Sequence, residues 1–237
     1  MPRVTVFPIA IAPVIACLLS AVSAAATWTD TPVARLEALA LIQSLNAELL
    51  SSASATLTLE RWCRDHALAD PAQIFARRID APAVPPSEEV RSDLQVSSAD
   101  PVRYRQVELT CGAHVLSVAE NWYVPYRLTP EMDRLLDETQ TPFGKVVLPL
   151  RPHRETLAVQ QLWSPLPAGW EGLRNSSSHG APEARVAAVP LNIPPALFEH
   201  RAVLYTEAHV AIAEVREVYQ RDLLDFPEPQ IARRSAR

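Results

Sequence analysis

Two segments of this chain alternate polar and apolar side chains on either side of a short turn, and this pattern restricts the fold more than any other feature. Residues 101–111 and 114–124 flank Gly112, and a second unit runs from about residue 202 to residue 219 with its turn at residues 207–208. Side chains of an extended chain point to alternate faces, and two strands joined by a tight turn pair antiparallel. The sequence therefore predicts two β-hairpins and an antiparallel sheet.

The longest helical pattern covers residues 31–52, ahead of the first hairpin. Its apolar side chains recur at helical spacing along one face: Ala34, Ala38, Leu41, Ile42, Leu45 and Leu49. Asp30 or Thr31 can cap this helix, and Pro32 suits its first turn. Three further leucines lie off the stripe, so we expect the helix to be covered on more than one side.

Shorter elements complete the pattern. We expect short helices at residues 57–66 and 129–139, single strands at residues 72–80 and 156–163, and a Pro-containing link at residues 81–89. Residues 164–195 are rich in Pro, Ser and Gly and indicate an irregular surface insertion, and residues 226–237 a flexible tail. Hairpins combined with helices predict one α+β domain over residues 27–237, an antiparallel β-sheet with flanking helices.

The N-terminal segment, residues 1–26, has the layout of a secretory signal peptide. An uncharged apolar run follows Arg3 and ends in small residues that permit cleavage near Ala24 or Ala26. The run is also long enough to span a bilayer, so an uncleaved membrane anchor is the other explanation. Two prolines within the run favour cleavage. We therefore expect a periplasmic or secreted protein, which is membrane-anchored if the segment stays uncleaved.

Cysteine usage and charge narrow the functional classes. Export would leave Cys63 and Cys111 in a compartment that permits a disulfide, although two unrelated buried thiols also fit the sequence. No cysteine or histidine spacing matches a metal site, so we expect no metal. The net charge of −5, without a long basic run, argues against nucleic-acid binding. We expect a monomer whose contact with membranes is limited to the signal.

Two charged residues fall on the apolar faces of the predicted hairpins. Alternation places Arg105 beside Val107, and Glu217 on a face of small apolar residues. An unpaired buried charge is costly, so a buried ion pair, an edge position that lets both head groups reach water, or a ligand site would each explain them. Glu214 and Arg216 fall on the opposite face, which we expect to be exposed, but Glu214 competes with Glu217 as the site carboxylate.

Four stretches carry a resemblance when they are taken in order. They are LLSSASATLTLERW, then RYRQVELTCG with NWYVP, then LDETQTPFGKVV, and finally EHRAVLYTEAHVAIAEVREVY. Together they resemble chorismate pyruvate-lyase and the wider chorismate lyase-like family, across nearly all of the chain after the signal. The resemblance implies an antiparallel sheet whose helices close over a small buried pocket. It also implies conversion of chorismate to 4-hydroxybenzoate and pyruvate, with no cofactor.

The resemblance also implies roles for individual residues. Arg105 would bind a carboxylate of the substrate, because a guanidinium forms two parallel charge-assisted hydrogen bonds with such a group. Glu217 would lie at the hydroxyl end of the ring as the acid–base group. The implied contacts through the backbone are Phe143, Gly144, Leu57 and Thr58.

The chain departs from the family pattern in ways that keep a second function open. Gln106 replaces the usual acidic residue, and Asn121-Trp122 replaces the usual Arg-Thr pair. Chorismate is made in the cytoplasm, so an exported lyase would need an external supply. The related UTRA effector-binding domains keep this fold and pocket without catalysis. The alternative is therefore an exported, non-catalytic protein that binds a small aromatic carboxylate.

Overall fold

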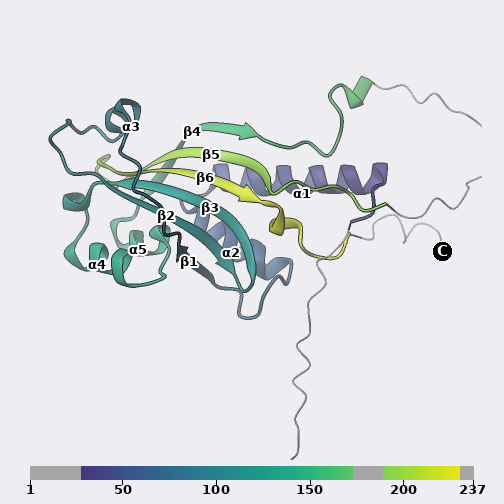
Figure 1. Cartoon of the computed structure of the whole chain (residues 1–237), viewed down its shortest axis with the longest axis horizontal. Helices are drawn as coiled ribbons and strands as arrows, with labels where there is room; N and C mark the ends of the chain where they lie inside the picture. The colour runs from purple at the N-terminus through teal and green to yellow at the C-terminus, as the bar shows by residue number, and fades with distance from the viewer. Residues whose placement is uncertain (1–27, 173–188, 230–237) are drawn as a thin grey trace, which may run out of the picture.

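The computed structural model describes residues 28–172 and 189–229. The predicted signal peptide, residues 173–188 of the predicted insertion and residues 230–237 of the predicted tail lie outside the described residues. Within the described ranges, six strands form one antiparallel sheet in the order β1-β2-β3-β6-β5-β4 (Figure 1). The strands are β1 (Ile74–Arg78), β2 (Arg103–Cys111), β3 (His114–Tyr123), β4 (His153–Gln161), β5 (Ala196–Tyr205) and β6 (Ala211–Gln220). Both predicted hairpins and the α+β class are confirmed.

Helices cover both faces of the sheet. They are α1 (Pro32–Ser51), α2 (Ala55–Asp65), α3 (Glu88–Asp93), α4 (Pro130–Glu138) and α5 (Phe143–Val146). One face carries two apolar clusters: α1 and α2 pack on one end of it, and α4 and α5 on the other. The short helix α3 packs on the opposite face, against Trp122 and Val203 (Figure 1).

Local sequence explains why the long helix lies where it does. Thr31 is its N-cap and accepts a hydrogen bond from the amide of Ala34 at 3.0 Å, which stabilises the first turn. The predicted apolar stripe is the face that the helix buries, except that Leu41 is only partly buried. The other candidate cap, Asp30, pairs instead with Arg35.

Several predicted boundaries need correction. The second helix begins at Ala55 rather than Leu57, because Ser54 serves as its cap. The strands β4 and β5 begin earlier than predicted, at His153 and Ala196. Helix α3 falls partly within the segment predicted to be a link, since its single turn is too short to show a helical period.

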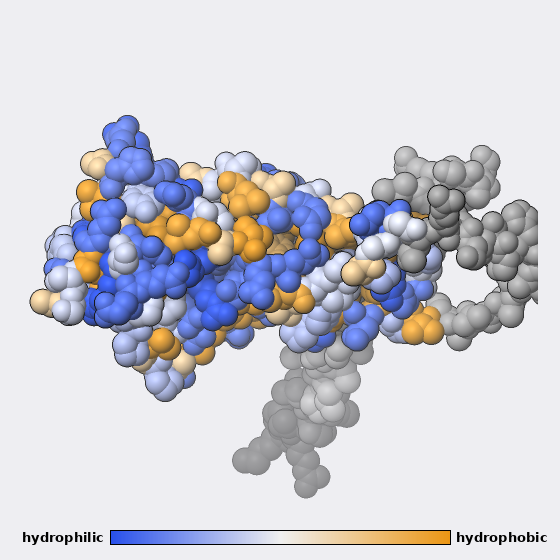
Figure 2. Space-filling model, turned by 90° about the horizontal axis from the view of Figure 1, so that it is seen from above, coloured by the Kyte–Doolittle hydropathy of each residue, from blue (hydrophilic) through white to orange (hydrophobic). Residues whose placement is uncertain are grey.

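The outer edges of the sheet differ in exposure. β1 is short, ends in two arginines, and its Ala76 amide donates to the carbonyl of Gln140 at 2.7 Å. β4 is mostly exposed, with Leu157 and Val159 at 37% and 44%. Apolar residues are visible among hydrophilic ones on the face seen from above (Figure 2). An uncovered edge strand that lacks charge in its centre is a place where strands of other chains can pair.

A disulfide joins Cys63 of α2 to Cys111 of β2. Both half-cystines are fully buried in the cluster formed by α1 and α2. The bond decides the question that the sequence left open. It also fixes the C-terminal part of α2 against the sheet.

Candidate functional site

A cavity lies between the two apolar clusters on the face covered by four helices. Its volume is about 30 Å³, within a hollow of about 430 Å³ that is partly open to solvent. Its wall is apolar where the sheet contributes Val107, Leu109 and Val215, and it is closed by residues of α5 and of the loop before α2. A hollow with an apolar wall and a few polar groups is typical of small-molecule sites.

Glu217 and Arg154 form a buried ion pair in the wall of this cavity. The Nη2 of Arg154 lies 2.8 Å from Oε2 of Glu217, and the two side chains are 2% and 7% exposed. Arg154 reaches from β4 across β5 to β6, and its Nη1 donates to Thr156 at 2.8 Å. Tyr219 also donates to Oε2 of Glu217, at 3.0 Å. Glu217 is therefore held by donors from two strands.

Arg154 is the site residue that the sequence did not reveal. Residues 153–155 precede the strand predicted at 156–163, so no alternation argument placed this guanidinium on a buried face. The inward positions of Arg105 and Glu217 in the sequence are compatible with an ion pair between these two residues. Both are buried, at 2% and 6% exposure, but the partner of Glu217 is Arg154.

Two further buried residues near the ion pair, His200 and Tyr219, carry no charge at pH 7. His200 is fully buried, and its Nε2 lies 2.7 Å from Oδ1 of Asn46 in α1. Burial, assisted by the nearby charge of Arg154, lowers the pKa of His200 to about 4, so its ring is neutral at pH 7. Burial also raises the pKa of Tyr219 well above its ordinary value, which keeps its hydroxyl available as a donor to Glu217.

Arg105 lies next to the cavity and has spare hydrogen-bonding capacity. Its cross-strand neighbour Asn121 lines the cavity and pairs in turn with Val215 of β6, another lining residue. Neither Nε nor Nη1 of Arg105 has a hydrogen-bond acceptor among the described residues. Burial and the nearby Arg78 lower the pKa of Arg105 to about 10, so the guanidinium is still charged at pH 7. A buried cation with free donors suits an anionic ligand group.

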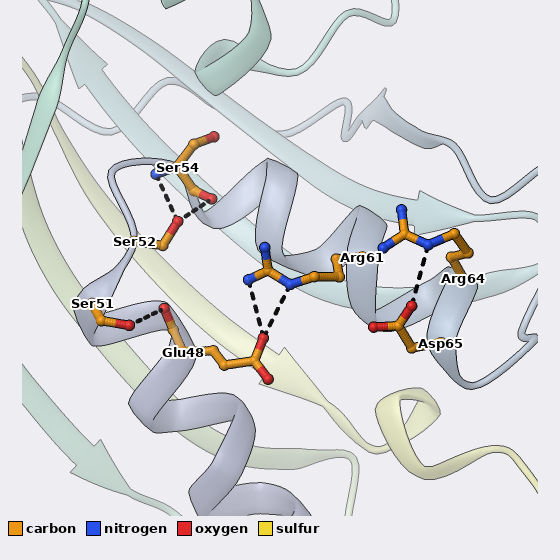
Figure 3. Close-up of polar contacts among 7 residues, drawn as sticks. All are labelled: Glu48, Ser51, Ser52, Ser54, Arg61, Arg64 and Asp65. Carbon is orange, nitrogen blue, oxygen red and sulfur yellow. Dashed lines mark hydrogen bonds and ion pairs between the residues drawn. The ribbon is translucent and has the colours of Figure 1, made fainter.

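The wall facing the sheet is built by α5, by the loop before α2 and by the first residues of α2. A Cβ atom at Gly144 would lie 2.8 Å from Oγ1 of Thr56 and 3.1 Å from Oγ of Ser54, so only glycine allows the approach. Ser52 fixes the loop by hydrogen bonds with the backbone of Ser54 at 3.2 Å (Figure 3). Arg61 ties α2 to α1 through Glu48 at 3.1 Å (Figure 3).

The structure therefore brings together four of the expected site residues but not all six. Glu217, Phe143 and Gly144 line the cavity, and Arg105 adjoins it. Leu57 is 40% exposed and Thr58 is fully buried, and neither lines the cavity. The residues of this region that line the cavity lie earlier in the chain, at positions 53–56, because α2 begins before its predicted start.

Glu214 is also buried, which corrects the expectation of an exposed polar face. It lies 1% exposed beneath α3, on the face of β6 opposite to Glu217. Its Oε1 is 3.6 Å from Nε of Arg201. Burial, with repulsion from Asp93, raises the pKa of Glu214 to about 7. Glu214 is not a cavity residue.

In residues 28–172 and 189–229, no group of three or more His, Cys, Asp or Glu side chains could hold a metal ion. No helix of those same ranges is long and apolar enough to cross a membrane.

Comparison with solved structures gives distant similarity. YydK from Bacillus subtilis, described as a possible transcriptional regulator, matches at 14% identity and a TM-score of 0.38; the match covers 65% of this chain and 61% of YydK. The effector domain of PhnF from Mycobacterium smegmatis matches at 16% identity and a TM-score of 0.40, covering 67% of this chain and 88% of that domain.

No family model matches the chain. Comparison with individual protein sequences gives a much stronger similarity than comparison with solved structures. The uncharacterized protein y4mC of Sinorhizobium fredii, strain NBRC 101917 / NGR234, is 45% identical over 205 residues, which cover 85% of this chain and 83% of y4mC. With this identity over most of both proteins, the chain belongs to the same family as y4mC.

Proposed function

We propose that the cavity binds a small aromatic or cyclohexadiene carboxylate. The observation that carries this proposal is a buried Arg105 with two free donor nitrogens beside a partly enclosed, largely apolar cavity. The guanidinium would bind the carboxylate bidentately, and Val107, Leu109 and Val215 would contact the ring. Glu217 lines the same cavity and would meet the substituent that the ring carries away from its carboxylate.

We further propose that the ligand is chorismate and that the protein is a lyase releasing 4-hydroxybenzoate and pyruvate. In that reaction a proton leaves C4 of the ring, the C3–O bond to the enolpyruvyl group breaks, and the departing enolpyruvate takes up a proton to become pyruvate. Aromatisation drives the step without an oxidant. The support is the ordered motif resemblance together with Glu217 in the cavity wall, where it could hydrogen-bond the C4 hydroxyl.

A non-catalytic binding protein is the second candidate, and the Arg154–Glu217 pair favours it. Glu217 is already engaged by Arg154 and by Tyr219. A carboxylate held in this way serves well as a fixed hydrogen-bond acceptor and less well as a carrier of protons. This candidate uses the same cavity and the same class of ligand.

The deciding experiment is to incubate the purified chain with chorismate and quantify pyruvate and 4-hydroxybenzoate, alongside calorimetric titration with 4-hydroxybenzoate. Many turnovers per chain would establish the lyase. Saturable, stoichiometric binding without turnover would establish the binding protein. If neither binding nor turnover is observed, the cavity does not bind this class of ligand and both candidates fail.

Glu217→Gln tests the catalytic role of Glu217. The lyase proposal expects product affinity within about tenfold of wild type, or roughly 1.4 kcal/mol, because the amide is isosteric. Turnover should fall by about a hundredfold or more, the scale of losing an acid–base group. Glu214→Gln, on the opposite face of β6, is the matched control and should change neither quantity much. Undiminished turnover in Glu217→Gln would contradict a catalytic role for Glu217.

A further inference from the structure

The charges around the cavity place different demands on its two ends. Arg105 is a buried cation with free donors, whereas Arg154 is already opposed by Glu217 at 2.8 Å. The first end therefore needs an anion from the ligand. The second end is electrically balanced by the protein itself.

At the end of the cavity that holds Arg154 and Glu217, the described residues donate hydrogen bonds to only one oxygen of Glu217. Both donors to Glu217, Arg154 and Tyr219, bind its Oε2. No described residue donates to Oε1 of Glu217, although this side chain lines the cavity. An ionised carboxylate only accepts hydrogen bonds, so the ligand group that meets it must be a donor.

Arg154 is what makes this end selective. A second carboxylate at this end of the ligand would lie against the carboxylate of Glu217, and burial makes that repulsion costly. A ligand ammonium would meet the guanidinium of Arg154 and be repelled in turn. A hydroxyl group carries no charge and can donate to Glu217, so it suits the pair.

We propose that Arg154 is a specificity-determining residue, which holds Glu217 as a fixed acceptor so that the cavity selects carboxylates that bear a hydroxyl group, and not a second carboxylate, at the end opposite Arg105. This inference rests on the proposed function, because it assumes that Arg105 binds the carboxylate of the ligand. Arg154 acts through Glu217 as a positioning residue. This role would restrict the ligands to a narrower class than aromatic carboxylates in general.

The test compares how much a hydroxyl group on the ligand changes affinity in the wild type and in a variant that lacks Arg154. Calorimetry measures the affinities of benzoate, 4-hydroxybenzoate and terephthalate for the wild type and for Arg154→Met. In the wild type, 4-hydroxybenzoate should bind at least about tenfold more tightly than benzoate, as a hydrogen bond to a charged acceptor predicts. Terephthalate should bind more weakly than benzoate. In Arg154→Met the hydroxyl preference should shrink to within about threefold, since Glu217 is no longer held in position.

Further variants separate the role of Arg154 from damage to the fold. Arg154→Lys keeps one positive charge and should restore part of the preference. The double variant Arg154→Met/Glu217→Gln leaves no uncompensated charge at this ion pair, so it can replace Arg154→Met if that single variant does not fold. The double variant should also lose the preference for 4-hydroxybenzoate over benzoate. Arg216→Met removes an exposed guanidinium from the opposite face of β6 and should keep the full preference.

The outcomes are distinguishable from failure of the proposed function. Equal wild-type affinity for benzoate and 4-hydroxybenzoate, or tighter binding of terephthalate, would overturn the inference while carboxylate binding stands. A tenfold preference that persists in Arg154→Met, or in the double variant, would overturn it as well. Absence of binding by all three ligands would remove the proposed function and this inference with it.

Discussion

Two inward-facing charges, Arg105 and Glu217, are accommodated by different means. Glu217 has an internal partner in Arg154, whereas the Nε and Nη1 atoms of Arg105 have no acceptor among residues 28–172 and 189–229. A buried donor without an acceptor costs about 1–3 kcal/mol, and more when it is charged. Such a cost is typical of a site that a ligand completes. The difference between the two residues therefore assigns them different roles.

Arg105→Lys tests this assignment. We expect affinity for 4-hydroxybenzoate to fall by about tenfold or more while the folded state persists, because an ammonium cannot reproduce the bidentate fork. Calorimetric titration measures the affinity, and thermal unfolding checks the fold. Arg216→Lys, at an exposed position on the opposite face of the sheet, is the control. An unchanged affinity accompanied by a large loss of thermal stability would instead identify Arg105 as a structural residue.

Glu214 leads to a prediction on pH. Burial raises its pKa in the folded state to about 7, from an ordinary value of 4.5. The folded state therefore binds this proton more tightly than the unfolded state does. The resulting stability is fully present below pH 4.5 and is lost as the pH rises to 7.

Replacing the group should remove that dependence. Relative to Glu214→Gln, the wild type should lose on the order of 2 kcal/mol in free energy of unfolding between pH 4.5 and pH 7.5. Urea denaturation at a series of pH values measures the difference. Parallel stability curves for the two proteins over this range would show that Glu214 does not titrate there.

Among the elements, α5 and the N-terminal end of α2 approach each other closely at the wall of the cavity. Their approach depends on Gly144, where a Cβ would meet Thr56 Oγ1 at 2.8 Å. Gly144→Ala should therefore destabilise the fold by about 1–3 kcal/mol and weaken ligand binding, because Thr56 must shift. Thermal unfolding and calorimetry measure the two effects.

A second substitution and a control sharpen this test. Adding Thr56→Ala to Gly144→Ala removes the clashing oxygen and should restore part of both quantities. Gly172→Ala should be neutral, since a Cβ there meets no heavy atom within 4 Å. If Gly144→Ala bound and unfolded like the wild type, the two elements would be free to separate, and the proposed wall would not be fixed.

For the whole molecule, the Cys63–Cys111 disulfide closes a loop of sequence separation 48. Cross-links of this kind stabilise by roughly 2–5 kcal/mol, mainly by restricting the unfolded chain. The melting temperature of the wild type should thus fall on reduction to that of the double variant Cys63→Ala/Cys111→Ala. The double variant itself should not respond to reductant. A wild type whose melting temperature is unaffected after complete reduction would contradict a stabilising role.

The disulfide also supports the proposal of export, because such bonds persist in oxidising compartments. Expression of the full chain in a Gram-negative host, followed by fractionation and N-terminal sequencing, tests the proposal. We expect periplasmic protein that begins just after Ala24 or Ala26. Soluble cytoplasmic protein that retains Met1 would overturn it.

Features encoded by neighbouring residues were predictable from the sequence. The two hairpins follow from period-two alternation around short turns, and Gly112 adopts the positive φ of 56° that such a turn requires. The position of α1 follows from its apolar stripe and the Thr31 cap. Alternation also placed Glu217 and Arg105 on a buried face. These properties depend on backbone geometry within a few residues, which the sequence states directly.

Other features depended on which distant segments meet. Arg154 reaches Glu217 across 63 positions, and only the strand order that places β4 beside β5 brings them together. Glu214 was expected to be exposed, yet α3 covers it. The disulfide required α2 to pack on β2. Local periodicity shows which face a side chain takes but not what packs against that face, so the sequence by itself determined the elements and only the tertiary structure decided the partners of their charged residues.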